Sequence, residues 1–396
     1  MRLIALILLA AGALAIGAGP ASAAPPDPVL AALQRAEATG ALPAPQGAVY
    51  RQILAQARAV RAGLRGVRRR ELAAVLTIAG RIAKRGDLVP ARMPAVFLTL
   101  QRNAEWWAVN GPPAPGSPGE NGARGRRCRP LRAVRAARVE FPGSELVFQY
   151  YRGTGLQLQM NGTWGKANAL FASSNPVFTA RGAALLSELL PLGVARAGVL
   201  AWEYLFPVYG GRPPWISGLA QATAVQALTR AAAKLGRPDL LGVAGATASA
   251  FAFPPPAGVR SRVGRGAAWF VLYSFAPRQR VLNAHLDALA ALFDLTQASG
   301  NVVARISYER GLLAARRRIR GYDTGKWSKY ANPGALADLN YHVLNTTLAG
   351  EVCKRSGDAR ICGAAGSFAR ELERRCPRVG VAAEARAART EVAGGA

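Results

Sequence analysis

Histidine and cysteine are scarce in this sequence of 396 residues, which contains two histidines and four cysteines. Zinc ribbons, multi-finger proteins and iron–sulfur proteins need repeated sets of such ligands, so the composition excludes these classes. The two histidines, His285 and His342, fall on separate expected helices, and no group of carboxylates accompanies both. We therefore expect no metal site and no cofactor.

Acidic residues are also few: 22 Asp and Glu stand against 51 Lys and Arg, which gives a net charge of +29. Most of the excess is arginine. Because arginine content can follow genome composition, the shortage of acids is the better indication of a polyanionic partner. Hydrophobic residues make up 51% of the chain, enough for a sizeable core, and this excludes a disordered protein.

The short motifs of several enzyme classes are missing. The sequence has no Gly-x-Ser-x-Gly elbow, no Gly-rich loop that ends in Lys-Ser/Thr, and no His-Glu-x-x-His. A Gly-x-Gly-x-x-Gly pattern after an expected strand is missing too. Esterases with a nucleophile elbow, P-loop nucleotide hydrolases, zinc proteases and dinucleotide-dependent enzymes therefore lose support.

The N-terminus has the pattern of a secretory signal peptide. Met1-Arg2 is a short positive start, residues 3–19 are apolar or small, and Ala21-Ser22-Ala23 supplies a cleavage site. We expect cleavage after Ala23, with residues 1–23 removed, and a secreted or extracytoplasmic protein. The alternative is an uncleaved anchor, which the following prolines disfavour. No later stretch is long and apolar enough to predict a membrane span.

Export permits disulfide bonds. Four cysteines allow three pairings, and their spacing alone does not choose among them. We favour a bridge between Cys353 and Cys362, across the turn at Ser356-Gly357-Asp358. A pairing of Cys128 with Cys376 is the weaker expectation.

The mature chain divides into four expected regions. Residues 24–94 have apolar residues at helical spacing, which predicts an N-terminal helical segment. Residues 95–175 are expected to form a small β-rich region with a Gly/Pro loop at 111–125 and a hairpin around Arg152-Gly153-Thr154-Gly155. A helical domain over 176–380 and a flexible tail over 381–396 complete the chain.

Helical periodicity dominates from residue 183. The expected helices cover 183–205, 216–235, 239–252, 281–297, 301–319, 335–353 and 358–375. A proline-rich and aromatic segment over 255–280 interrupts them and is expected to form a strand pair. The predicted fold class is mainly α with a smaller β-rich part, with an α/α toroid-like C-terminal domain that carries an inserted β-hairpin.

One block with possible chemistry begins at two prolines and Trp215, which open a helix of small residues that includes Gln221. A tryptophan ring can stack on a pyranose while amides bond its hydroxyls, so this block would suit a sugar-binding face. Close packing between helices through the small residues explains the block equally well.

Two further blocks combine tyrosines with polar residues. Tyr273 is followed by Arg278, Arg280 and Asn283; cations lower the pKa of a nearby phenol, and arginines bind a carboxylate in fork geometry. The other block contains Tyr322-Asp323-Thr324-Gly325, Tyr330 and Asn340-Tyr341-His342-x-x-Asn345. On a helix, Tyr341 and Asn345 share a face.

Taken together, these blocks resemble the C-terminal region of the D-glucuronyl C5-epimerases. The residues that carry the resemblance are Pro-Pro-Trp…Ala-Gln at 213–221, Val-Leu-Asn at 281–283 with Leu-x-x-Leu-Phe-Asp-Leu at 289–295, Tyr-Asp-Thr-Gly at 322–325 and Tyr-His at 341–342. It covers roughly residues 200–350. The resemblance implies an α/α toroid, a β-rich upstream part, and inversion at C5 of a glucuronate within a heparosan-like chain.

Such a reaction sets clear chemical requirements. The C5 hydrogen is α to a carboxylate, so its removal creates an enediolate-like dianion that Arg, Lys or a metal must neutralise. Inversion also needs one acid/base group on each face of the sugar. The resemblance implies that tyrosines supply them, and the aligned positions are Tyr273, Tyr330 and Tyr341, with Tyr273 and Tyr341 as the leading acid/base candidates.

The sequence departs from the family at two charged positions. Val271-Leu272 stands where acidic residues precede the first tyrosine, and Pro333 stands where an arginine is expected. Arg278, Arg280, Lys326, Lys329, Glu203 or His342 would have to substitute. The residues expected to bind substrate are Trp215, Gln221, Asn283, His342 and Asn345 together with Arg278, Arg280 and Glu203.

Two classes of function follow. The first is an exported enzyme that epimerises, or as a lyase cleaves, an acidic polysaccharide, because both reactions start with the same proton abstraction. The second is a non-catalytic protein that binds such a polyanion. Nucleic acid would also satisfy the charge, but export makes it an unexpected partner. The sequence is compatible with a homodimer and leaves the oligomeric state open.

Overall fold

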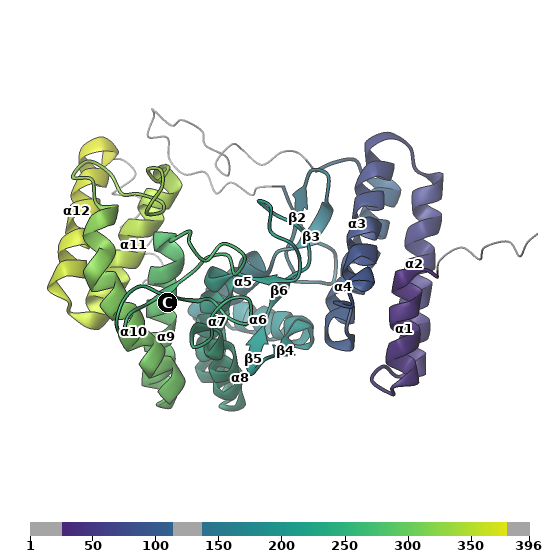
Figure 1. The fold of residues 1–396 in the computed structure, drawn as a ribbon, viewed down its shortest axis with the longest axis horizontal. Helices are drawn as coiled ribbons and strands as arrows, with labels where there is room; N and C mark the ends of the chain where they lie inside the picture. The colour runs from purple at the N-terminus through teal and green to yellow at the C-terminus, as the bar shows by residue number, and fades with distance from the viewer. Residues whose placement is uncertain (1–25, 114–136, 378–396) are drawn as a thin grey trace, which may run out of the picture.

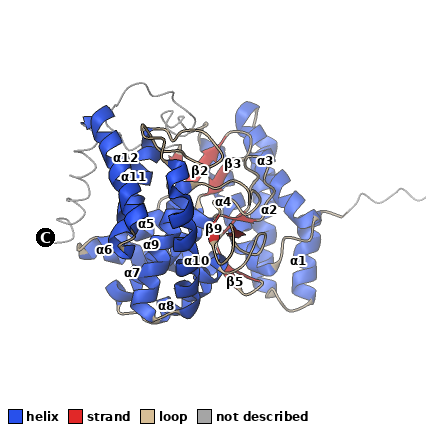
Figure 2. Ribbon diagram, turned by 60° about the vertical axis from the view of Figure 1, so that its left-hand side comes forward, coloured by secondary structure: helices blue, strands red, loops and turns tan. Residues whose placement is uncertain are grey.

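The computed structural model describes residues 26–113 and 137–377, which form three connected parts (Figure 1). Four N-terminal helices stand at one end, a small sheet follows, and a helical C-terminal part makes up the rest. Figure 2 shows the same order, with strands between the two groups of helices. The expected signal peptide at 1–23, most of the Gly/Pro loop at 111–125 and the tail at 381–396 lie outside the described residues.

The N-terminal part consists of α1 (Pro28–Ala38), α2 (Ala44–Gly63), α3 (Gly66–Lys84), the 3-10 turn η1 (Pro90–Arg92) and α4 (Met93–Val109). On α4, the buried residues Val96, Leu100, Asn103 and Trp107 recur at i, i+4, i+7 and i+11 and face α2 and α3. The helical segment therefore continues to residue 109, and the expectation that the β-rich region starts at residue 95 is wrong.

A three-stranded antiparallel sheet follows, in the order β1 (Arg138–Val139), β2 (Phe148–Tyr151) and β3 (Gly155–Leu158). The register of β2 and β3 places Gln149 opposite Gln157. This confirms the hairpin predicted from the turn residues between them.

The turn of this hairpin is fixed from α3. The buried Glu71 carboxylate accepts hydrogen bonds from the backbone N of Gly153 (2.9 Å), from the backbone N of Gly155 (3.0 Å) and from the Tyr150 hydroxyl (2.9 Å). Gly155 has φ +77°, and a Cβ there would stand 2.4 Å from Cγ2 of Val75. Only glycine allows this close approach of strand and helix, so the N-terminal helices determine where the hairpin lies.

The C-terminal part is built on eight helices. They are α5 (Met160–Ala172), α6 (Pro176–Leu189), α7 (Gly218–Leu235), α8 (Asp239–Ala248), α9 (Leu282–Ser299), α10 (Val302–Arg318), α11 (Leu339–Ser356) and α12 (Ala359–Arg375). In an inner row, α5 contacts α7, α7 contacts α9, and α9 contacts α11. The other helices form an outer row, in which α6 packs on α5, α8 on α7, α10 on α9 and α12 on α11. This two-layer arc confirms the predicted α/α toroid type.

Two boundaries of this part were predicted wrongly. Because α5 is the first helix of the inner row, the helical domain begins near residue 160 and not at residue 176. The expected helix over 183–205 ends at Leu189, where the turn η2 (Leu190–Leu192) follows. Ala197 and Gly198 then have positive φ values of +46° and +78°, so the chain forms the hairpin β4 (Val194–Arg196) and β5 (Val199–Ala201) instead.

Short strands and bridges connect the loops at one end of the inner helices. β6 (Glu203–Tyr204) pairs with β7 (Trp215–Ile216), and β8 (Arg260–Arg262) pairs with β9 (Ala268–Phe270), which confirms the strand pair predicted within 255–280. The turns η3 (Ser249–Phe251) and η4 (Ile319–Tyr322) are the remaining regular elements. Isolated bridges join Ser217 to Tyr273 and Val281 to Ala331, so the segments that precede α7, α9 and α11 are held together.

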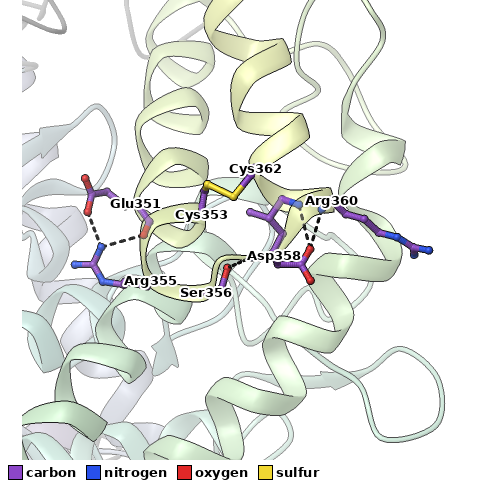
Figure 3. The surroundings of a disulfide bond; sticks show 8 residues. Glu351, Cys353, Arg355, Ser356, Asp358, Arg360 and Cys362 are labelled. Carbon is purple, nitrogen blue, oxygen red and sulfur yellow. Dashed lines mark hydrogen bonds and ion pairs between the residues drawn. A yellow bond between two sulfur atoms is a disulfide. The ribbon is translucent and has the colours of Figure 1, made fainter.

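The predicted disulfide between Cys353 and Cys362 is confirmed, and it joins the last turns of α11 to the first turn of α12 (Figure 3). The two Cα atoms are 4.8 Å apart. Gly357, with φ +63°, ends α11, and the Asp358 carboxylate accepts the backbone N–H of Arg360 to begin α12. The Cys128–Cys376 pairing stays a prediction, because Cys128 lies outside the described residues.

None of the helices in the described ranges is both long and apolar enough to cross a membrane.

Candidate functional site

A cavity of about 510 Å³ opens between the β2–β3 hairpin and the N-terminal ends of the inner helices. Aromatic side chains form much of its wall, and two guanidinium groups and several amides supply the polar positions. This combination of aromatic surface and a few polar groups is typical of a small-ligand or sugar site.

The three tyrosines singled out in the sequence meet in this cavity. Tyr273 follows β9, Tyr330 lies in the segment between η4 and α11, and Tyr341 is in the first turn of α11. The Tyr330 phenol interacts electrostatically with the phenols of Tyr273 and Tyr341. Its ring centroid lies 4.6 Å from that of Tyr341. Phenols from three separate segments therefore form one connected group.

Backbone contacts fix these positions. The backbone N of Leu282, at the start of α9, donates to the Tyr330 carbonyl (3.0 Å). The Asp338 carboxylate accepts the backbone N–H of Tyr341 (2.9 Å), which caps α11 at the tyrosine. The tyrosines are thus placed by helix N-termini and short bridges, not by a flexible loop.

The pKa values of two of these phenols are raised. Burial is the main cause for both Tyr330 and Tyr273, and the neighbouring phenols raise the pKa further. Most molecules therefore carry both phenols in the protonated form at neutral pH, and a small fraction carries a phenolate. The expectation that nearby arginines lower the pKa of Tyr273 is wrong.

The arginines at the cavity differ from those expected. Arg278 is exposed and Arg280 half-buried, and neither lines the cavity; the Arg280 carbonyl instead accepts a hydrogen bond from the Tyr322 hydroxyl (2.8 Å). Arg138 of β1 and Arg152 of the hairpin turn line it. Sequence reasoning identified the turn but missed its role, because no local pattern shows that the sheet docks over the inner helices.

Two other expected residues do line the cavity. The Trp215 ring stacks on Tyr204 with centroids 4.2 Å apart and meets Tyr273 edge-on at 5.7 Å. Its indole N–H donates to the Phe206 carbonyl (2.9 Å). Asn283 is 1% exposed, and neither polar atom of its amide has a hydrogen-bond partner among the described residues. A buried amide without a partner is costly, so a ligand that bonds to it would gain affinity.

Gln221 and Glu203, which were expected to bind substrate, have structural partners instead. The Gln221 amide accepts the backbone N–H of Trp202 (2.9 Å) and donates to a carbonyl of β5. The buried Glu203 carboxylate pairs with Arg92 at 2.6 Å and with Arg196, and so connects the N-terminal helices to β6. Neither residue lines the cavity.

His342 and Asn345 act behind the cavity wall. The His342 ring stacks on Trp327 at 3.6 Å, its Nδ1 accepts the backbone N–H of Ser328 (3.1 Å), and burial lowers its pKa to about 4. The Asn345 amide donates to the Ser328 hydroxyl (3.0 Å) and to the Lys329 carbonyl. Both side chains therefore hold the segment that presents Tyr330, and neither reaches the cavity.

Among the described wall residues of the cavity there is no carboxylate and no imidazole. One carboxylate behind the wall is that of Asp287 on α9, which sequence reasoning missed although it interrupts an apolar helix. The Thr223 hydroxyl lies 3.2 Å from its Oδ2 and 3.2 Å from Oδ1 of the wall residue Asn161. Burial raises the pKa of Asp287 to about 6.

No three His, Cys, Asp or Glu side chains of the described ranges are grouped in a way that could hold a metal ion.

Comparison with known proteins agrees with the resemblance noted in the sequence. Residues 197–368 match the family described as D-glucuronyl C5-epimerase C-terminus. An uncharacterized protein of Methanocaldococcus jannaschii is 28% identical over 152 residues, 37% of this chain and 49% of that protein. The chain thus spans about half the length of this curated relative.

Two solved structures are similar to part of the chain. The cellobiose 2-epimerase of Bacillus thermoamylovorans is 13% identical, with a TM-score of 0.39 over 55% of this chain and 61% of that one. A sugar epimerase from a ruminal bacterium is 15% identical, with a TM-score of 0.36 over 54% of this chain and 59% of that one.

Proposed function

We propose that this protein, whose residues 197–368 carry a D-glucuronyl C5-epimerase C-terminal domain, acts on an acidic polysaccharide by removing and returning the proton at C5 of a uronate. The observation that carries the proposal is the meeting of Tyr273, Tyr330 and Tyr341 in one cavity within the matched domain. The family match supports epimerase-like action on a carbohydrate, and the polymer and the position attacked are the finer part of the proposal.

The cavity offers a group for each step of that reaction. Arg138 and Arg152 would bind the uronate carboxylate and offset the second negative charge that develops when the C5–H bond breaks. An ionised phenol takes the C5 proton, and the electron pair of that bond spreads into the carboxylate. A neutral phenol on the opposite face then returns a proton to C5, so that no atom is gained or lost.

The phenol cluster would connect the two faces of the sugar. Tyr330 lies close to both Tyr273 and Tyr341, so its hydroxyl would pass a proton between the two candidate acid/base groups. After one turnover the base holds a proton and the acid has lost one. Transfer through Tyr330 would restore the starting state, and the phenolic protons would exchange with water between turnovers.

Exchange at C5 tests this function directly. The mature protein would be incubated in heavy water with heparosan, chondroitin-type and mannuronan chains, and C5 examined by NMR. Deuterium at C5 without chain cleavage is the expected result, and the Tyr273→Phe/Tyr341→Phe double variant should show none while still binding the glycan. An unsaturated product that absorbs in the ultraviolet would indicate a lyase. Absence of exchange on every polymer would contradict the enzyme.

A non-catalytic glycan-binding protein is the second candidate, and one observation favours it. The described wall of the cavity carries no carboxylate or imidazole, and Val271-Leu272 and Pro333 replace the charged residues that the family resemblance implies. Val271 is fully buried in the core, and Leu272 packs beside Tyr273 and gives the cavity wall an apolar side chain. Glycan binding that is equal in the parent and the double variant, without exchange in either, would support this candidate.

Export and assembly also stay proposals. A mature chain that begins at Ala24 in N-terminal sequencing of the protein from its natural host would support the signal peptide and a secreted or extracytoplasmic location. The mass of the purified protein in solution would test the homodimer.

A further inference from the structure

A second cavity, of about 690 Å³, adjoins the tyrosine-lined one. The two share three wall residues, Arg138, Asn161 and Gly162. The remaining wall of the second cavity comes from α5, α6 and the sheet, within residues 138–181. This range lies outside the segment that matches the epimerase family, so the match assigns it no role.

We propose that this second cavity binds the sugar residues that neighbour the reacting uronate, so that the protein recognises a chain and not a single sugar. The inference rests on the proposed function, because it takes an acidic glycan as the ligand of the first cavity. Its first support is continuity. A Cβ at Gly162 would stand 3.5 Å from Nη2 of Arg138, so the shared wall has a guanidinium beside a residue without a side chain.

The second support is an aromatic ring at the far side. Phe178, in the first turn of α6, lines the cavity and is 39% exposed. The C–H face of a pyranose can stack on a ring exposed in this way, beside the polar groups of the cavity. The Arg181 guanidinium lies 6.0 Å from the ring centroid, so apolar and cationic surface are presented together.

The third support is the charge of the cavity. Lys166 and Arg181 each approach the Glu145 carboxylate to 2.6 Å, and these partners lower the pKa of Glu145 to about 2. Glu145 therefore stays ionised and holds both cations at the wall. With Arg138 and Glu140 included, three cations face two carboxylates, which leaves one positive charge for a carboxylate or sulfate on the glycan.

The length dependence of binding tests the inference. Affinities for glucuronate and for a heparosan hexasaccharide would be measured by NMR titration for the parent and for Phe178→Ala. We expect the parent to bind the hexasaccharide more tightly than the monosaccharide, and Phe178→Ala to lose about tenfold on the hexasaccharide with no change on the monosaccharide. Phe253→Ala is the matched control, because Phe253 is also 39% exposed but packs near Gly198. It should change neither affinity.

Lys166→Met is a second variant, which removes a positive charge from the second cavity instead of an aromatic ring. It should weaken hexasaccharide binding and reduce its salt dependence, again without an effect on the monosaccharide. If both variants bind the hexasaccharide as the parent does, the second cavity is not a subsite, although the proposed function stands. If the parent binds neither sugar, nor chondroitin-type or mannuronan hexasaccharides, the proposed function fails and the inference with it. Displacement of the hexasaccharide by a DNA oligonucleotide, equally in parent and Phe178→Ala, would show recognition of charge alone and overturn the inference.

Discussion

The rings of Tyr330 and Tyr341 lie 4.6 Å apart, centroid to centroid, at an angle of 56°, although the two residues belong to different segments. Tyr341 is fixed by the cap of α11 and Tyr330 by a backbone hydrogen bond to the start of α9. Their distance therefore depends on the packing of two inner helices of the toroid, and it sets the geometry that any proton transfer in the cavity would use.

Removing the central hydroxyl should separate catalysis from binding. In Tyr330→Phe the ring should still pack, but the hydroxyl that interacts with Tyr273 and Tyr341 is lost. We expect C5 deuterium exchange to fall about a hundredfold, as for the loss of an acid/base group, with glycan affinity nearly unchanged. Exchange over many turnovers in heavy water gives the rate, because Tyr330 would act between turnovers. An unaltered rate would exclude Tyr330 from the proton path.

The rate of exchange should rise with pH. Because burial raises the pKa of Tyr330 and Tyr273, only a small fraction of either phenol is ionised at neutral pH. The basic form then grows about tenfold for each pH unit below the pKa, so kcat/KM should increase steadily from pH 6 to pH 9. A profile that falls over this range, measured where the protein stays folded, would contradict a phenolate base.

Arginine variants should show which guanidinium groups meet the glycan. Arg152 lines the cavity and Arg278 does not, and both are exposed, so neither substitution should unfold the protein. We expect Arg152→Met to weaken binding of a uronate oligosaccharide about tenfold, with a smaller effect at high salt, and Arg278→Met to leave it unchanged. Calorimetric titrations at two salt concentrations make the comparison. The reverse ranking would favour the arginines expected from the sequence.

The free energy of unfolding should decrease as the pH rises, because folding raises the pKa of the Asp287 carboxyl. Its pKa is raised from 3.8 to about 6 in the folded state, so the unfolded carboxyl ionises first. The free energy of unfolding should therefore fall as the pH rises from about 4 to about 6, by about 3 kcal/mol at most. Asp287→Asn should remove this loss and raise the midpoint of urea unfolding at pH 8.

The neighbouring carboxylate on α9 is the control. Asp294 accepts two hydrogen bonds from Arg355, at 2.8 and 2.9 Å, so Asp294→Asn should lower the stability at pH 8. Stabilisation by both substitutions would show that the effect comes from net charge and not from the burial of Asp287.

The disulfide should contribute a moderate stabilisation. It closes a loop with a sequence separation of nine residues, for which the loss of chain entropy predicts about 2–3 kcal/mol. The Cys353→Ala/Cys362→Ala variant should unfold at lower urea concentration by this amount, and a reducing agent should have less effect on the variant than on the parent. Equal stability would indicate that the packing of α11 on α12 and the turn at Gly357 and Asp358 hold the two helices together without the disulfide.

The helical pattern of the toroid could be predicted from the sequence, whereas several boundaries between its elements could not. Leu282, Leu286 and Leu289 repeat along one face of α9, and the structure buries all three residues, as this local pattern predicts. By contrast, α4 and α5 lie beside glycine-rich or alternating segments. The expected helix after residue 183 ends at Leu189, next to the turn with Pro191, and the chain then reverses at Ala197 and Gly198, whose positive φ values no apolar pattern predicts.

The site was predictable to the extent that ordered motifs pointed to it. Tyr273, Tyr330, Tyr341, Trp215 and Asn283 were found because their spacing resembles a family. Polar residues in the same motifs, such as His342, proved to satisfy backbone groups, which sequence alone does not separate from ligand binding. Arg138 and Arg152 were missed because they arrive through the docking of a sheet on helices distant in the chain.

The anchoring of the β2–β3 turn by Glu71 has a practical consequence for anyone who wants to shorten this protein. The matched segment alone would retain all three phenols yet be deprived of the hairpin and of the cationic groups that it delivers. A fragment of residues 197–368 would therefore have an incomplete cavity. Its failure to act on a sugar would say nothing about the intact molecule.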